Sequence, residues 1–151
     1  MNGDFETDEG WIVANTPVKA RYSDVAAHTG RRALQLGIVD PGENRFSYTS
    51  VEQRFSLPAG QSAVISWWYH APDGGGSGDY GYFLLKPDGG SWRIIRIIRE
   101  ATLDWTQIEV DVGHYAGRSF TLRLGMRNDG AGDGAAAVMY VDSLSLQVCR
   151  P

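Results

Sequence analysis

The side chains in this sequence that could do chemistry are aromatic and charged rather than nucleophilic. Trp67 and Trp68 are adjacent in an alternating segment, and adjacent residues of a strand point to opposite faces of their sheet. If Trp67 lies in a core, Trp68 lies on the outer face, together with His70 two residues later. Aromatic rings beside polar groups suit a sugar, because its C–H face stacks on the ring while its hydroxyls form hydrogen bonds.

Companions for Trp68 are expected from later strands. Tyr82 is opposite in phase to Phe83, and Arg123 and Arg127 share one face of a strictly alternating segment. The arginines would donate to hydroxyls or to an acidic sugar. The expected ligand-binding platform comprises Trp68, His70, Tyr82, Arg123 and Arg127. The alternative is that Trp68 packs beneath a loop.

Motifs for catalysis are absent from the sequence. It contains no Gly-x-Ser-x-Gly, His-Glu-x-x-His, P-loop or Cys-x-x-Cys pattern. The three histidines are far apart, and the glycine-rich segment 74–78 precedes an expected strand rather than the helix that a phosphate loop needs. A carboxylate pair for glycoside hydrolysis stays open, because it requires only proximity in space.

A run of arginines, Arg93, Arg96 and Arg99, occupies one predicted strand. Strict alternation would place Arg93 and Arg99 on one face and Arg96 on the other. We interpret the run as an edge strand protected from aggregation by charge, with a binding patch as the alternative.

Composition limits the protein class. The 151 residues fit one domain, with 19 glycines and 6 prolines favouring turns and short strands. A net charge of −4 gives no reason to expect nucleic acid or membrane-surface binding, and no apolar run is long enough for a membrane span. No signal peptide is visible, and the lone Cys149 has no internal disulfide partner. We expect residues 1–151 to be a single module from a larger secreted protein.

Alternating apolar and polar residues predict an all-β domain. Strands are expected at 32–37, 48–57, 61–71, 79–86, 92–99, 105–112, 118–127 and 136–148. Turn residues separate them, including the hairpin turn 87–90 and glycine-rich loops at 72–78 and 128–134. No segment could supply crossover helices, so an antiparallel β-sandwich is favoured over a parallel α/β fold.

The ends of the chain resemble those of a known group of domains. The opening Asn-Gly-Asp-Phe-Glu at 2–6, followed by Gly-Trp, and the closing Tyr-Val-Asp-Ser-Leu-Ser-Leu at 140–146 resemble galactose-binding-like modules of bacterial carbohydrate-active enzymes. Ile-Ser-Trp-Trp-Tyr at 65–69 is similar to one of their strands. Pro-Asp-Gly-Gly-Ser-Trp at 87–92 resembles the hairpin of MAM-like and immune inhibitor A accessory domains beside secreted metallopeptidases.

This resemblance implies a jelly roll with a structural calcium ion. Glu6 and Asp142 match the usual carboxylate ligands, and backbone carbonyls near Asp4 and Thr29 would assist. Ser143 stands where a second aspartate is common, which would weaken the charge of the site.

The expected function is therefore that of a non-catalytic, secreted or cell-surface accessory module. It would bind a polysaccharide on the concave face of the sandwich and adjoin other domains of a parent protein. The alternative is a structural or protein-interaction domain beside a peptidase or surface anchor, without a glycan ligand.

Overall fold

The strands follow one another with almost no helix between them. A computed structural model describes residues 2–74, 78–131 and 136–149. Its strands are β1 (Ile12–Val13), β2 (Arg21–Ser23), β3 (Ala33–Gly37), β4 (Phe46–Ser56), β5 (Ser62–His70), β6 (Tyr80–Pro87), β7 (Arg93–Ile98), β8 (Thr106–Asp111), β9 (Ser119–Asp129) and β10 (Val138–Cys149). Two single 3₁₀ turns, η1 (Pro41–Glu43) and η2 (Gly113–Tyr115), complete the described elements.

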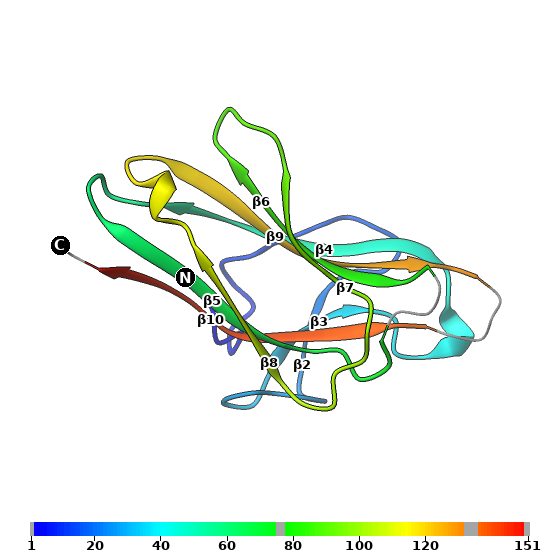
Figure 1. The fold of residues 1–151 in the computed structure, drawn as a ribbon. Helices are drawn as coiled ribbons and strands as arrows, with labels where there is room; N and C mark the ends of the chain where they lie inside the picture. Colours follow the sequence, from blue (N-terminus) through cyan, green and yellow to red (C-terminus); the bar gives the residue numbers. More distant parts are fainter. Residues whose placement is uncertain (1, 75–77, 132–135, 150–151) are drawn as a thin grey trace.

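The strands form two antiparallel sheets of five strands each. Sheet A has the order β1-β4-β9-β6-β7, and sheet B has the order β2-β3-β10-β5-β8. Figure 1 shows the two sheets as two layers. Most strands that follow each other in sequence, such as β5 and β6, lie in different sheets, whereas β2–β3 and β6–β7 are neighbours in one sheet. The predicted all-β, antiparallel, jelly-roll sandwich is confirmed.

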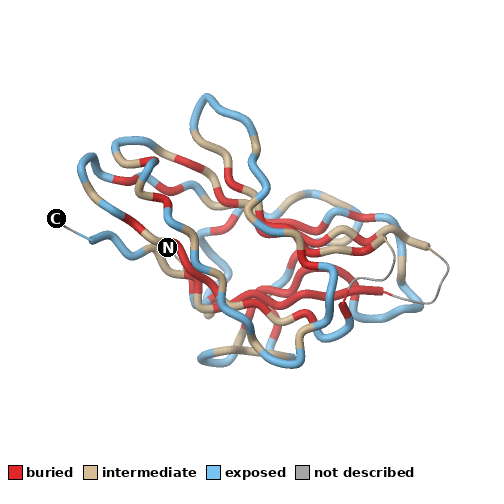
Figure 2. The backbone as a smooth tube through the Cα atoms, in the orientation of Figure 1, coloured by how far each residue is buried: buried red, intermediate tan, exposed pale blue. Residues whose placement is uncertain are grey.

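Alternation along each strand turns one set of apolar side chains toward the space between the sheets. Figure 2 shows buried residues recurring along the strands of both layers. Trp67 of sheet B and Phe83 of sheet A are both fully buried, and their rings meet edge to face at 4.9 Å. Aromatic pairs in this geometry stabilise a core beyond the area that they bury. Trp67 is therefore a core residue, as expected, and Trp68 points outward.

The eight predicted strands all exist, with ends within about two residues of those expected. β1 and β2 were not expected, because strands of two and three residues are too short for an alternation pattern. Residues 75–77 and 132–135, in the two predicted glycine-rich loops, lie outside the described residues.

The predicted faces of the arginine strand are wrong in part. β7 is an edge strand of sheet A, as interpreted. However, Phe83 pairs with Arg96 whereas the next residue, Leu84, pairs with Ile94, so a bulge interrupts the register. The extra residue shifts the alternation. Arg93 and Arg96 consequently lie on the inward-facing side, and Arg99 lies on the outer side with Tyr80.

Within the described part of the chain, no helix has the length and apolar character needed to cross a bilayer.

Candidate functional site

The outer face of sheet A is built around its central strand, β9. Arg127 pairs with Tyr48 of β4 and with Tyr80 of β6. Two residues earlier, Gly125 pairs with Ser50 and with Tyr82. Paired residues share a face of the sheet, so the register brings tyrosines from two strands to either side of β9.

Five aromatic rings gather on this face. Tyr82 lies 6.3 Å from both Tyr48 and Tyr80, and Phe46 contacts Tyr48 edge to face at 5.5 Å. The three tyrosines line a depression of about 300 Å³ on this face, and Trp92, from the turn between β6 and β7, lines it as well. We call this surface the aromatic platform; its members are Phe46, Tyr48, Tyr80, Tyr82, Trp92, Arg99, Arg123 and Arg127.

Tyr82 forms the floor of the aromatic platform. Its side chain is only 6% exposed although it points away from the core. A Cβ added to Gly125 would lie 2.2 Å from the ring carbon Cζ of Tyr82, so the missing side chain lets the ring lie against β9. Burial raises the pKa of the Tyr82 phenol, against a smaller lowering by a hydrogen bond with Ser50.

Two of the rings above this floor are open to solvent, whereas Tyr80 and Trp92 are half-buried. Phe46 is 56% exposed and Tyr48 is 42% exposed. Isolated exposed hydrophobic residues need no explanation, but a contiguous aromatic group rimmed by charges indicates a binding surface.

The arginines of the aromatic platform are held against its rings. Arg123 lies 4.1 Å from the centroid of Trp92, and its Nε donates to Glu52 at 2.6 Å. Arg127 lies 5.6 Å from Tyr80 and donates to the carbonyl of Gly78. Cation–π contacts and hydrogen bonds thus orient both guanidinium groups.

The structure does not assemble the single platform expected from sequence. Tyr82, Arg123 and Arg127 lie together on the outer face of sheet A, but Trp68 and His70 are on the outer face of sheet B. The reason is that the chain crosses between sheets after β5. The hairpin of Tyr82 therefore does not adjoin Trp68.

A loop residue covers Trp68. The His28 ring stacks on it at 4.2 Å with an interplanar angle of 15°. The same outer face carries a small second core formed by Ala33, Val138 and Tyr140, with Trp105 against it. These contacts agree with the alternative reading in which Trp68 packs beneath a loop.

His70 is tied into the framework of the domain. Its Nδ1 lies 3.0 Å from the hydroxyl of Thr102, which also accepts the amide of Ala71 at 2.8 Å. A ligand-binding role for Trp68 and His70 stays a prediction, and any such ligand would lie on sheet B, apart from the aromatic platform.

Asp142 anchors the loop that covers Trp68. Its carboxylate is fully buried and accepts the amides of His28 and Thr29 at 2.8 and 2.9 Å and that of Ser143 at 2.6 Å. Burial raises the pKa of Asp142, whereas the amide hydrogen bonds oppose that rise.

Glu6 holds the other side of the same loop. Its Oε1 accepts the amides of Arg31 and Arg32 at 2.7 and 2.9 Å, and these bonds lower the pKa of Glu6. Glu6 and Asp142 thus bind backbone amides of one loop, and their role as calcium ligands stays a prediction.

Other expected calcium ligands contribute less. Asp4 is exposed and accepts the Glu6 amide at 3.4 Å, and the Thr29 hydroxyl lies 2.9 Å from that of Ser143. Among described residues, no group of three or more His, Cys, Asp or Glu side chains could hold a metal ion. Calcium takes 6–8 oxygens, so backbone carbonyls would have to complete a shell begun by Glu6 and Asp142.

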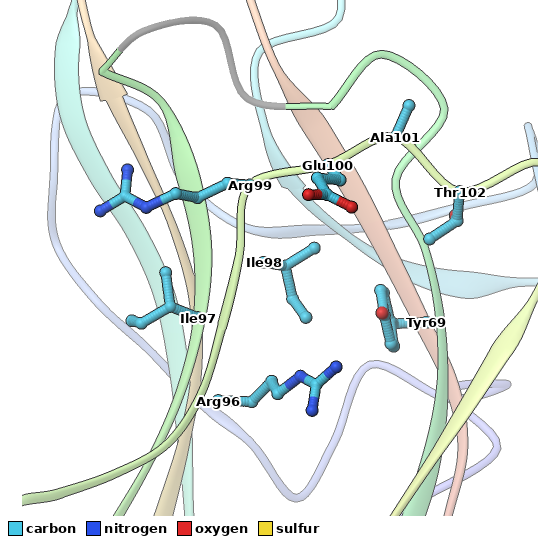
Figure 3. A pocket seen from close by; sticks show the side chains of 8 residues that line it. All are labelled: Tyr69, Arg96, Ile97, Ile98, Arg99, Glu100, Ala101 and Thr102. Atoms are coloured by element: carbon cyan, nitrogen blue, oxygen red, sulfur yellow. The ribbon is translucent and has the colours of Figure 1, made fainter.

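A separate hollow of about 410 Å³ lies along the edge where β7 approaches β5 (Figure 3). Figure 3 shows Arg96 and Ile98 pointing toward Tyr69 of the other sheet, whereas Ile97 and Arg99 point to the opposite side of β7. The edge strand thereby separates this hollow from the aromatic platform.

Sequence reasoning missed several members of the aromatic platform, namely Phe46, Tyr48, Tyr80 and Trp92, and considered Arg99 only within a possible arginine patch. Tyr48 could have been found, because Val51 and Phe55 mark the inner face of its strand and Tyr48 has the opposite phase. The role of Gly125 depends on its pairing with Tyr82, which single-strand alternation does not provide.

The sequence matches no protein-family model and no curated protein. Solved structures give the decisive comparison. TmCBM61, a family 61 carbohydrate-binding module solved with β-1,4-galactotriose, has a TM-score of 0.66 and 17% identity over 96% of this chain and 90% of that chain. The chain has the jelly-roll fold of carbohydrate-binding modules.

Two further structures show how widely this fold is used. The CBM22-1 xylan-binding domain of Paenibacillus barcinonensis Xyn10C has a TM-score of 0.60 and 17% identity, covering 99% of this chain and 93% of that chain. The K2 cleaved adhesin domain of Lys-gingipain has a TM-score of 0.61 and 12% identity, with 96% of each chain covered. At these identities the likeness concerns the fold.

Proposed function

We propose that this protein is a non-catalytic carbohydrate-binding module of a secreted or cell-surface protein, and that it binds glycan on the aromatic platform of sheet A. The observation that carries the proposal is the cluster of exposed and half-buried aromatic rings over the buried Tyr82, flanked by oriented arginines. Sugar rings stack on such surfaces through their C–H faces, and guanidinium groups donate to their hydroxyls.

The fold of known carbohydrate-binding modules supports this proposal. The cleaved adhesin domain supports a second candidate, a protein-interaction domain beside a peptidase. A protein-interaction domain without a glycan ligand would have Trp68 covered by a loop, and the His28 ring does stack on it. The exposed rings of the aromatic platform favour glycan binding instead.

A glycan array probed with the purified domain, with calcium present, tests the proposal. We expect binding to one class of polysaccharide and loss of that binding in Tyr48→Ala. If the domain bound no glycan on a broad array, the glycan proposal would be rejected and the protein-interaction candidate favoured.

We further propose that Glu6 and Asp142 help to hold a structural calcium ion beside the loop at 28–32. Calcium would link the carboxylates that already organise this loop. The expected result is a melting temperature raised by calcium and lowered by a chelator, because a ligand that binds only the native state stabilises it. Glu6→Ala should abolish the calcium response, whereas the exposed Glu9→Ala should preserve it; equal melting curves with calcium and with chelator would contradict the proposal.

A further inference from the structure

The aromatic platform is enriched in cations, although the chain as a whole is acidic. The net charge of the chain is −4. Arg99, Arg123 and Arg127 nevertheless converge on the rings of this one face. From this segregation we infer that the glycan bound by the aromatic platform is a polyanion, bearing carboxylate or sulfate groups. The inference rests on the proposed function and specifies its ligand class.

Among the described residues, two of these arginines, Arg99 and Arg127, form no ion pair. Arg99 and Arg127 flank the same ring, at 4.7 and 5.6 Å from the centroid of Tyr80. Across the described residues, the ion pairs within 4 Å are Arg32–Asp8, Arg54–Asp88 and Arg123–Glu52, so neither Arg99 nor Arg127 takes part. Their charges are available to a ligand.

The acidic residues of the same face cancel this charge only in part. Glu52 pairs with Arg123, and Asp129, whose Oδ1 accepts the amide of Ala131 at 2.8 Å, keeps its negative charge, so three arginines face two carboxylates. The excess cations would raise the local concentration of a polyanion and strengthen its binding.

The geometry suits an anion better than a neutral sugar alone. The N–H groups of Arg99, and those of Arg127 other than the one that donates to the Gly78 carbonyl, match the paired oxygens of carboxylate or sulfate. Arg99 and Arg127, one on each side of Tyr80, can contact successive charged units while a sugar ring lies on the exposed Tyr48. A chain of charged sugars would thus use both the rings and the arginines.

Single-stranded nucleic acid also combines stacking with negative charge, and its binding would be a different function. The experiment therefore compares four probes by calorimetry at low and high salt: polygalacturonate, the same polymer after carboxyl reduction, dextran sulfate and oligo-dT. Polygalacturonate and dextran sulfate distinguish carboxylate from sulfate as the bound group.

We expect at least one anionic polysaccharide to bind, with an affinity that falls as the salt concentration rises. If the protein recognises carboxylate, the carboxyl-reduced polymer should bind at least about tenfold more weakly than polygalacturonate. Arg99→Gln and Arg127→Gln should each weaken binding about tenfold, because each removes hydrogen bonds to a charged group. Arg118→Gln makes the same charge change at an exposed turn and should bind as the wild type does.

The polyanion inference would be overturned, with the proposed function intact, if the neutral, carboxyl-reduced polymer bound at least as tightly as both anionic polymers. Failure to bind these polymers and every neutral glycan on the array would overturn both. Tighter binding of oligo-dT than of either anionic polymer would also overturn the inference.

Discussion

Replacement of Gly125 by alanine is expected to destabilise the domain and to abolish glycan binding on the aromatic platform. The new Cβ would lie 2.2 Å from Cζ and 2.4 Å from the hydroxyl oxygen of Tyr82. Because the Tyr82 ring is buried beneath its neighbours, it cannot move aside without displacing them. Overpacking of this kind costs about 1–3 kcal/mol. Chemical denaturation and calorimetric titration with the glycan found on the array measure the two effects.

A double-mutant cycle separates the ring contact from any other effect of the new methyl group. In Tyr82→Ala the obstructing ring is absent, so adding Gly125→Ala should cost little further stability. Gly90→Ala is a matched control, since its nearest neighbours outside the adjacent residues lie 3.4 Å away. An additive cycle, with Gly125→Ala equally harmful in both backgrounds, would show that the ring contact is not the cause.

Replacement of Asp142 by alanine is expected to cost roughly 2–4 kcal/mol of unfolding free energy, even without calcium. The substitution leaves three backbone amides, those of His28, Thr29 and Ser143, without their acceptor in a site where the carboxylate was fully buried. The loop should then detach from Trp68. Amide hydrogen exchange at His28, together with denaturation in the presence of chelator, reports both changes.

Asp142→Asn is the matched control for charge. It keeps one carbonyl oxygen as an acceptor and should destabilise the domain less than alanine does. Binding to the aromatic platform should survive in both variants under conditions where they remain folded, because Asp142 belongs to sheet B. Unchanged stability and exchange in Asp142→Ala would contradict the anchoring role of this carboxylate.

Strand positions were predictable because every second residue of a strand faces the core, which leaves an alternation of apolar and polar residues in the sequence. Phe120, Leu122 and Leu124 are all fully buried, and the residues between them face outward. Alternation within a strand does not reveal its partners. The bulge in β7 shows a second limit. Through a change in pairing with β6 it places Arg93 and Arg96 on the same face, whereas simple alternation would put them on opposite faces.

The candidate site was predictable only in part for the same reason. The phase of Tyr82, Arg123 and Arg127 was correct, and all three share one outer face. Their grouping with Trp68 failed, because sequence neighbours β5 and β6 lie in different sheets. The resemblance of the chain ends singled out Glu6 and Asp142 as possible calcium ligands. Their hydrogen bonds to amides of the same loop became evident only from the structure.

The central claim is that glycan binds the outer face of sheet A, and paired affinity measurements on two variants test it most directly. Tyr48→Ala removes an exposed ring from the aromatic platform, and Trp68→Ala removes a ring from the opposite face. With the glycan identified on the array, Tyr48→Ala should weaken binding by about 1–3 kcal/mol, on the scale of base–aromatic stacking, and folded Trp68→Ala should bind as the wild type does. Loss of binding in Trp68→Ala, with full affinity retained in Tyr48→Ala, would contradict the account and place the ligand on sheet B.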